Sequence, residues 1–285
     1  MTQHRSARWI GRTVAAAGAA AGAIALGTVY GRGRMQRTFE AESTTLEGIA
    51  RTSPVTRVDR LRLQALPAPV QRYVEASGAA GSPGLRIAQV RQRGVLQADR
   101  QSRGIAFRSR QVYSMNPPAF TWLGSFSFAP GVRGWVRDRY IDGRGETLVK
   151  ALSVIPLVNA RGPEIDQGAA LRFWGEVLAF PEIVTDPRLQ WEAVGEREAV
   201  VHIFDRGEAY SARVGFSADG FYESFRTQRY RDERGAGVLT DWSGRMSAWT
   251  QFDGRWFPSR WTSVWHLEDG DLDAVTMDVE AVETR

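Results

Sequence analysis

The 285-residue chain contains no cysteine. This absence excludes disulfide bonds, thiolate metal sites, a cysteine nucleophile and a lipid-modified N-terminal cysteine. Only three histidines are present, and the two that lie outside the N-terminal segment, His202 and His266, belong to no metal-binding or hydrolase motif. Lys150 is the only lysine, so a Schiff-base mechanism has a single candidate. We therefore expect neither a bound metal nor a cofactor.

Acidic residues are absent from the first 39 positions, which hold six arginines. The remaining chain has 31 of the 37 Lys and Arg residues against all 32 Asp and Glu residues, so it is close to neutral. Nucleic-acid binding requires a basic surface. The composition of the main part of the chain therefore argues against a nucleic-acid partner.

The N-terminal arginines flank an apolar segment, residues 14–30, made largely of alanine and glycine. A bilayer core is crossed by about 20 apolar residues, so the segment is just long enough for a membrane helix. The alternatives are a signal peptide cleaved at Ala23-Ile24-Ala25 and a soluble amphipathic arm. We predict a single-pass anchor over residues 1–37, a polar linker over 38–54, and a domain over 55–285 on the extracytoplasmic side of the cell membrane.

The domain alternates between apolar and polar residues over many short segments, which is typical of antiparallel strands. An unusually apolar helix is predicted at about 166–178, and the pair Asp253-Gly254 predicts a tight hairpin in which Pro258 lies opposite Trp249. We predict a mainly β fold with inserted helices: a half-open antiparallel barrel of about 10–12 strands, with the helix packed on its concave face. The predicted strands are 85–96, 104–113, 120–128, 132–141, 146–154, 189–194, 199–204, 209–216, 221–230, 242–252, 255–267 and 272–282.

Nine of the ten tryptophans lie in the domain, and large aromatic residues either line an apolar pocket or fill a core. The candidates for a ligand-binding cavity are Trp122, Trp135, Phe173, Trp174, Val177, Leu178, Trp261 and Trp265. Its polar candidates are Asp138, Arg172 and Glu176. Arg172 and Glu176 are four residues apart, a spacing that also suits a simple ion pair within a helix.

Two charged stretches have structural explanations that we favour over ligand binding. The first, 137–146, holds three acids and three arginines. The alternative there is a phosphate or headgroup site, and we expect a solvated strand and hairpin. The second places Asp269, Asp271, Asp273 and Glu280 at the spacing of a calcium loop, but Ala274 occupies the position that requires glycine. We expect a polar hairpin tip.

Several segments resemble a family of uncharacterised bacterial membrane-associated proteins that share a domain of unknown function. These segments, which span residues 60 to 285, are Leu66-Pro-Ala-Pro-Val-Gln-Arg-Tyr-Val74, Asn116-Pro-Pro-Ala-Phe-Thr-Trp122, Asp138-Arg-Tyr-Ile-Asp-Gly-Arg-Gly145, Gly162-Pro-Glu-Ile-Asp-Gln-Gly168, Leu171-Arg-Phe-Trp-Gly-Glu176, Phe180-Pro181, Phe252-Asp-Gly-Arg-Trp-Phe-Pro258 and Trp265-His-Leu-Glu-Asp-Gly270. The fold of this family is similar to that of the LolA/LolB-like periplasmic lipoprotein carriers. The resemblance implies a cavity for acyl chains and assigns no catalytic residues.

These observations favour a membrane-tethered, non-enzymatic protein that binds a lipid-like or acyl ligand. One alternative is an envelope enzyme acting on a lipid or glycan, with Glu176, Asp138 or His202 as acid and base groups. Another is a scaffold that meets a protein partner through a sheet edge beside Pro258.

Overall fold

The computed structural model describes residues 3–129, 132–233 and 235–285, and gives side chains from Gly27 onward except at Ala129 and Val132. The side chains of most of the predicted membrane segment therefore lie outside the described part. The helices are α1 (Gln3–Thr52), α2 (Arg60–Gln64), α3 (Ala68–Ser77) and α4 (Pro163–Val177), with 3-10 turns η1 (Ala79–Gly81) and η2 (Pro181–Thr185). The strands are β1 (Ile87–Leu96), β2 (Ile105–Ser114), β3 (Ala119–Ala129), β4 (Val132–Ile141), β5 (Arg144–Ala151), β6 (Ile155–Ala160), β7 (Leu189–Ala193), β8 (Glu198–Asp205), β9 (Glu208–Phe216), β10 (Tyr222–Glu233), β11 (Ala236–Phe252), β12 (Arg255–Leu267) and β13 (Gly270–Thr284).

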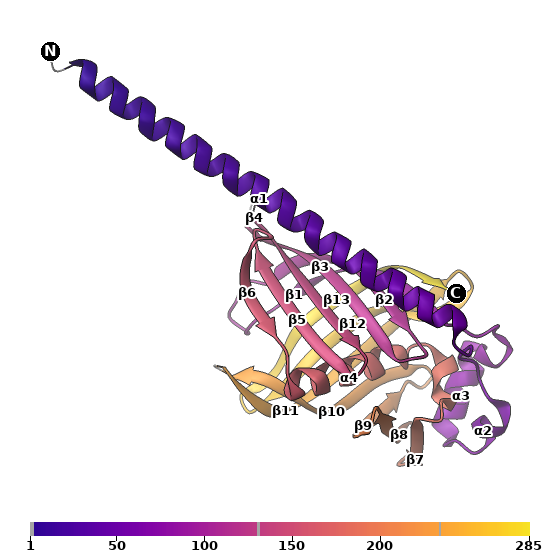
Figure 1. Ribbon diagram of the computed structural model, residues 1–285. Coiled ribbons are helices and arrows are strands. Elements are labelled where there is room, and N and C mark those ends of the chain that lie inside the picture. Colours follow the sequence, from indigo (N-terminus) through magenta and orange to yellow (C-terminus); the bar gives the residue numbers. More distant parts are fainter. Residues whose placement is uncertain (1–2, 130–131, 234) are drawn as a thin grey trace.

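The strands form one curved antiparallel sheet, shown in Figure 1, in the order β6-β5-β4-β3-β2-β1-β13-β12-β11-β10-β9-β8-β7. The mainly β prediction is confirmed. The described sheet has thirteen strands, more than the 10–12 predicted, and it is an open sheet with β6 and β7 at its edges. The strand missing from the prediction is β6, which lacks alternation because nearly all its residues are exposed.

Helix α4 lies inside the curve of the sheet and contacts β4, β5, β10 and β11, as predicted (Figure 1). Pro163 starts the helix, and Glu164 and Asp166 place negative charge in its first turn, where the helix dipole favours it. Phe173, Trp174 and neighbouring apolar residues are fully buried, because the sheet surrounds the helix on several sides. The apolar character that the sequence shows all round this helix thus matches its place in the fold.

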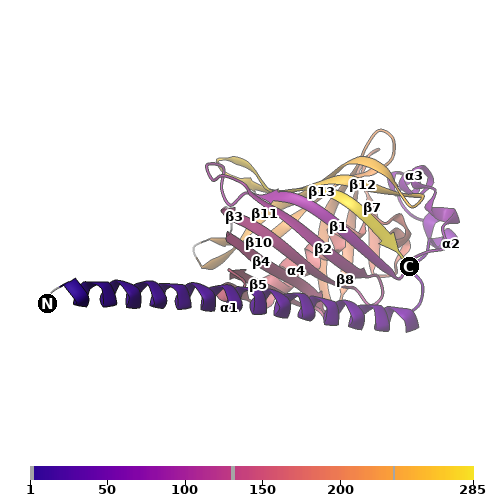
Figure 2. The ribbon, with the colours of Figure 1, turned by 90° about the horizontal axis from the view of Figure 1, so that it is seen from above.

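Helix α1 packs along the outer face of β2, β3 and β4 and projects past one end of the sheet (Figures 1 and 2). Residues 38–52, predicted to belong to a polar linker, are part of this helix. A helical stripe of Met35, Phe39, Leu46 and Ala50 is buried against the domain, while the rest of this segment is largely polar. Because polar residues outnumber this stripe, the sequence did not reveal that residues 38–52 form a helix packed on the domain.

No helix in the described part of the chain is both long enough and apolar enough to cross a membrane. The membrane anchor stays a prediction.

The hairpin between β11 and β12 confirms the prediction at Asp253-Gly254. Both residues have positive φ angles, 48° and 77°, as a two-residue hairpin turn requires. Pro258 lies opposite Trp249, as predicted. The described pairing of β12 with β13 covers only Arg260 to Leu267, so the N–H that Pro258 lacks is not needed for a hydrogen bond to β13. The strand is nevertheless internal to the sheet, and the sheet edges are elsewhere, at β6 and β7.

Candidate functional site: a cavity with a buried charged floor

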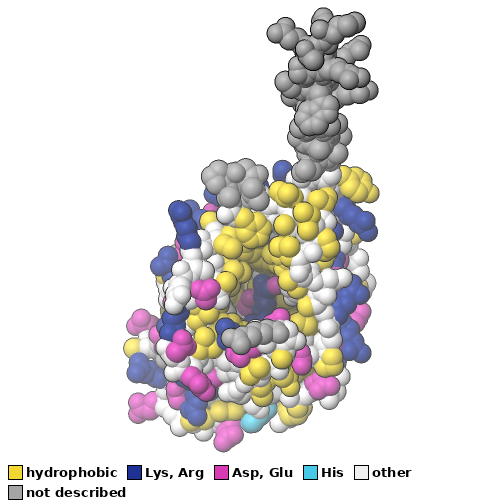
Figure 3. Space-filling model, turned by 90° about the vertical axis from the view of Figure 1, so that its left-hand side faces the viewer, with side chains coloured by type: hydrophobic (Ala, Val, Ile, Leu, Met, Phe, Trp, Pro, Cys, Tyr) yellow, Lys and Arg dark blue, Asp and Glu magenta, His cyan; other side chains and the backbone are white. Residues whose placement is uncertain are grey.

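A cavity of about 370 Å³ lies between the concave face of the sheet and α4. Its walls come from β1–β4 on one side and β10–β13 on the other. Figure 3 shows the hollow from its open end, with hydrophobic side chains around the mouth and basic side chains deep inside. The apolar residues that line it are Leu96, Ala98, Phe107, Trp122, Phe126, Val136, Trp242, Trp265, Leu272, Ala274, Val275 and Met277.

Strand alternation places these side chains inside. Phe107 stacks on Phe126 with ring centroids 5.0 Å apart, and the ring of Trp122 meets Phe107 edge-on at 5.9 Å. The indole of Trp122 donates a hydrogen bond to Gln92 Oε1. The aromatic wall is therefore fixed by ring contacts and by a buried polar partner.

Arg172 of α4 organises the floor of the cavity. Its Nη1 donates to Asp138 Oδ2 at 2.8 Å, and its Nε donates to Glu176 Oε1 at 2.9 Å. The other carboxylate oxygen of Glu176 accepts hydrogen bonds from Gln111 Nε2 and Tyr113 Oη, both at 2.7 Å. Two strands and one helix are thus tied together by a single network of charge-assisted hydrogen bonds.

The ionisation of this network follows from its surroundings. Burial acts to lower the pKa of Arg172, but the charges of Glu176 and Asp138 outweigh it and raise the pKa above its ordinary value. Burial, reinforced by the charge of Glu176, raises the pKa of Tyr113. Arg172 therefore stays charged and Tyr113 stays a neutral hydrogen-bond donor at physiological pH.

Arg229 and Arg231 of β10 also line the cavity; Arg231 pairs with Glu233, whereas Arg229 differs from both other arginines. Its guanidinium carbon lies 4.9 Å from the ring centre of Trp242 and 5.9 Å from that of Trp265. Its Nε is buried without a hydrogen-bond partner, and no described residue forms a hydrogen bond or ion pair with its side chain. Burial, together with the positive charge of Arg172, lowers the pKa of Arg229 to about 10, which leaves it charged at neutral pH.

The structure brings some of the predicted site residues together and separates others. Those that line the cavity are Trp122, Trp265, Asp138, Arg172 and Glu176.

Five further candidates belong to the packed core and do not line the cavity: Phe173, Trp174, Val177, Leu178 and Trp261. Trp174, for example, is fully buried and donates its indole N–H to Asp205 Oδ2 at 3.0 Å. These five side chains pack into the main core beside the cavity and are not part of its lining.

Trp135 lies on the opposite face of the sheet, in a separate cluster with Met35 and Phe39 of α1. Val136 and Asp138, by contrast, point inward from β4 and line the cavity. Adjacent residues of a strand face opposite sides. Composition marks Trp135 as an apolar aromatic but does not say which side of β4 it occupies.

The acid and base groups of the enzyme hypothesis do not converge. His202 lies on the outward side of β8, where its ring contacts Ser211 and Glu192. Glu176 and Asp138 do meet, at Arg172, but three donors occupy the carboxylate of Glu176 and Arg172 holds Asp138. The cavity offers a set of fixed charges and no assembled acid–base pair.

Sequence reasoning missed Arg229, Trp242 and Phe107, although the predicted strands contain all three. A usable signal was present in β10, where Phe225 and Arg229 have the same parity as Arg231. An arginine on the apolar side of a strand is unusual enough to mark a polar position inside a cavity.

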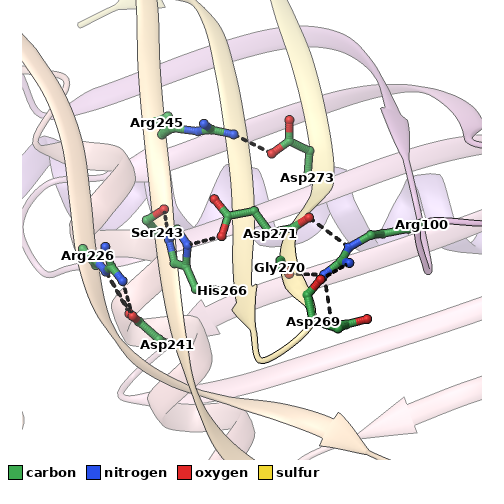
Figure 4. A network of polar contacts seen from close by, with 10 residues as sticks. All are labelled: Arg100, Arg226, Asp241, Ser243, Arg245, His266, Asp269, Gly270, Asp271 and Asp273. Carbon is green, nitrogen blue, oxygen red and sulfur yellow. Dashed lines mark hydrogen bonds and ion pairs between the residues drawn. The ribbon is translucent and has the colours of Figure 1, made fainter.

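The acidic stretch after β12 lies on the outer face of the sheet, among the residues drawn in Figure 4. Arg100 pairs with Asp269, Arg245 pairs with Asp273, and His266 contacts Asp271 at 2.7 Å. The hydrogen bond from His266 holds the pKa of Asp271 below its ordinary value. Each of these acids therefore has its own arginine or histidine partner, in keeping with a polar hairpin.

A second hollow, of about 760 Å³, lies outside the sheet between α1 and β1–β3. It is open and strongly charged: its lining includes Arg37, Arg91 and Arg108 together with Glu40 and Glu280. Several of these charges are paired, such as Arg108 with Glu280. An apolar ligand fits the inner cavity better than this outer hollow.

Comparison with known proteins places the chain in a family. The model of DUF6544, a family of unknown function, matches residues 56–277, and the chain belongs to that family. No protein with a curated description matches it.

Three solved structures are similar over most of their length. A domain of a proposed outer membrane lipoprotein-sorting protein from Vibrio parahaemolyticus is 12% identical, with a TM-score of 0.41, and the alignment covers 78% of this chain and 93% of that one. A LolA superfamily protein from Nitrosomonas europaea is 13% identical, with a TM-score of 0.42 and coverage of 82% and 94%. A DUF1329 family protein from Desulfovibrio piger is 12% identical, with a TM-score of 0.36 and coverage of 76% and 92%.

Proposed function

We propose that this protein is a membrane-tethered, non-enzymatic binding protein that holds a lipid-like or acyl chain in the cavity beside α4. The observation that carries the proposal is the cavity itself, about 370 Å³ in volume and walled by aromatic and aliphatic side chains. Ligand pockets have volumes of about 300–1,000 Å³ and are mostly apolar with a few placed polar groups. The cavity matches this description.

The position of the mouth supports a membrane source for the ligand. Helix α1 leaves the domain beside the turn between β5 and β6, where Gly31 lies against the backbone of Ser153. The N-terminal part of α1, which carries the predicted anchor, projects from that same end (Figures 1 and 2). If this helix enters a bilayer, the mouth lies near the membrane surface and an apolar chain has a short path into the cavity.

Large apolar side chains that remain exposed are concentrated on the strand ends and hairpins of this region. They include Val95, Phe128, Val154, Ile155, Leu157, Val158, Val238 and Leu239. Contiguous exposed apolar surface is typical of sites that contact membranes, partners or ligands. An apolar rim around an apolar cavity suits transfer of a lipid chain.

The proposal is tested by blocking the cavity. Val275 lines it from β13, and Thr276 points to the other side of the same strand. We expect Val275→Trp in the full-length protein to weaken binding of a fluorescent fatty acid by about tenfold or more, because the indole occupies the space of the chain. Thr276→Trp is the matched control and should bind as the unsubstituted protein does.

A second blocking variant guards against a folding defect in the first. Ala98 is exposed on the hairpin between β1 and β2 and also lines the cavity, so Ala98→Trp should be tolerated and should also weaken binding. Circular dichroism checks the fold of each variant, and native mass spectrometry shows whether lipid co-purifies. Equal probe binding by all variants, or no binding by the unsubstituted protein, would overturn the proposal.

A further inference from the structure

We infer that the ligand is a single-chain amphiphile with an anionic, oxygen-rich headgroup, such as a carboxylate, and that Arg229 binds this headgroup inside the cavity. This inference rests on the proposed function, because it names the class of molecule whose chain the cavity holds. It depends on the contrast between two arginines that line the cavity, Arg172 and Arg229.

Arg172 has a protein acceptor for each part of its guanidinium. Nη1 and Nε bind Asp138 and Glu176, and Nη2 lies 3.3 Å from Gln111 Oε1. Arg229 has no such acceptor among the described residues. A buried charged donor without an acceptor is costly, so structures seldom leave one unless something else binds there.

The surroundings of Arg229 fix its orientation. Trp242 and Trp265 lie under the guanidinium, and the indole of Trp242 is itself held by a hydrogen bond to Ser263 Oγ at 2.8 Å. On the α4 side, a Cβ built at Gly168 would lie only 3.2 Å from Arg229 Nε, so the absent side chain of this glycine makes room for the arginine. Tryptophan and glycine together hold Arg229 in one place.

Stacking engages the face of a guanidinium and leaves the donors at its edge free. Those in-plane donors match the paired oxygens of a carboxylate or phosphate. Arg229 is partly accessible while its Nε is buried, and it lines the cavity together with the apolar walls. A headgroup on the arginine edge would therefore have its chain against those walls.

The volume of the cavity favours one chain. At about 370 Å³ it is near the lower end of the range for ligand pockets. A molecule with two long acyl chains would need much more room.

Arg229 could instead serve only to balance the negative charges of Asp138 and Glu176. Arg172 and Arg229 together match the two negative charges of Asp138 and Glu176, and the further lining residue Arg231 is paired with Glu233. Under this alternative the arginine would not distinguish an anionic ligand from a neutral one of the same length. Comparing such ligands separates the two roles.

The experiment measures displacement of a fluorescent fatty acid from the full-length protein by laurate, lauryl alcohol and lauryl phosphate. These probes share one chain and differ in headgroup. We expect laurate to bind about 10- to 100-fold more tightly than lauryl alcohol, since a hydrogen bond to a charged group contributes about 1.5–3 kcal/mol. Lauryl phosphate distinguishes a carboxylate site from one that takes phosphate equally well.

Arg229→Met should remove most of the preference for laurate and leave the affinity for lauryl alcohol nearly unchanged. Arg226→Met is the matched control, because Arg226 lies on the same strand but its side chain is on the outer face of the sheet, where it pairs with Asp241. Thermal unfolding shows whether each variant is folded, and Arg229→Lys, which keeps the charge without the planar fork, should restore part of the preference.

The outcomes separate this inference from the proposed function. If laurate and lauryl alcohol bind equally well to the unsubstituted protein, or if Arg229→Met weakens both alike, the headgroup site is wrong while the apolar cavity stands. If no probe binds at all, the proposed function fails as well.

Discussion

At the scale of single residues, a glycine determines how closely α4 approaches the sheet. Gly145 lies at the start of β5, and a Cβ built on it would be 2.5 Å from the carbonyl oxygen of Ile165 and 2.9 Å from Ala169 Cβ. The backbone N–H of Gly145 donates to Asp166 Oδ1 at 2.7 Å. The first turn of α4 is thus fastened to β5 at a point where only hydrogen fits.

We expect Gly145→Ala to lower the free energy of unfolding by about 1–3 kcal/mol, because the backbone of α4 must move away from β5. Gly195→Ala is the control, since a Cβ there meets nothing within 4 Å and no strained backbone angle is involved. Urea unfolding of both variants measures the difference. Equal stabilities would show that α4 can shift at no cost.

Residue identity alone predicted only part of the site. Arg172 and Glu176 were found because their spacing and their apolar helix are visible in the sequence, and the structure places both at the cavity floor. Trp135 was misplaced because the face of a strand residue depends on the direction in which the whole sheet curves. The role of Arg229 depends on its having no hydrogen-bond acceptor among the described residues. A sequence shows neither the acceptors around a side chain nor their absence.

At the scale of elements, alternation located twelve of the thirteen described strands, and apolar content located α4. The predicted ends lie within three residues of the observed ones, except that β11 begins six residues earlier than predicted. These features persist in the sequence because one face of each element is buried. Edge strand β6 buries almost nothing, so it leaves no pattern. The docked half of α1 was missed for a related reason: its buried stripe is narrow, and polar contacts supply much of its interface.

Those polar contacts join α1 to the outer face of the sheet. Glu42 accepts hydrogen bonds from Thr121 Oγ1 and Arg137 Nη1, each at 2.7 Å. Arg137 also pairs with Glu146, which is buried. Phe39 lies beside this network in the apolar cluster that contains Trp135.

We expect Phe39→Ala to lower the free energy of unfolding by about 3 kcal/mol, as removal of a fully buried phenylalanine does. Ile49→Ala, at an exposed position of the same helix, should change it by less than about 0.5 kcal/mol. Chemical denaturation of the full-length protein compares them. Should the two variants be equally stable, α1 would not be an integral part of the domain.

At the scale of the whole molecule, the mouth of the cavity and the projecting part of α1 share one end, while α2 and α3 lie at the other (Figure 1). This polarity means that a tether through α1 would present the mouth, and not the far end, to the membrane. Leu157 and Leu61 offer a matched comparison. Leu157 is 58% exposed on β6 near the mouth, and Leu61 is 80% exposed on α2.

We expect Leu157→Glu to slow uptake of a fluorescent fatty acid from phospholipid vesicles by roughly tenfold, because a carboxylate at the rim opposes apolar contact with the bilayer. Its equilibrium affinity for the same probe in solution should be unchanged, since Leu157 does not line the cavity. Leu61→Glu should leave both the rate and the affinity unaltered. Stopped-flow fluorescence measures the transfer rate, and equal slowing by both substitutions would point to a general charge effect and remove the argument for a mouth that faces the membrane.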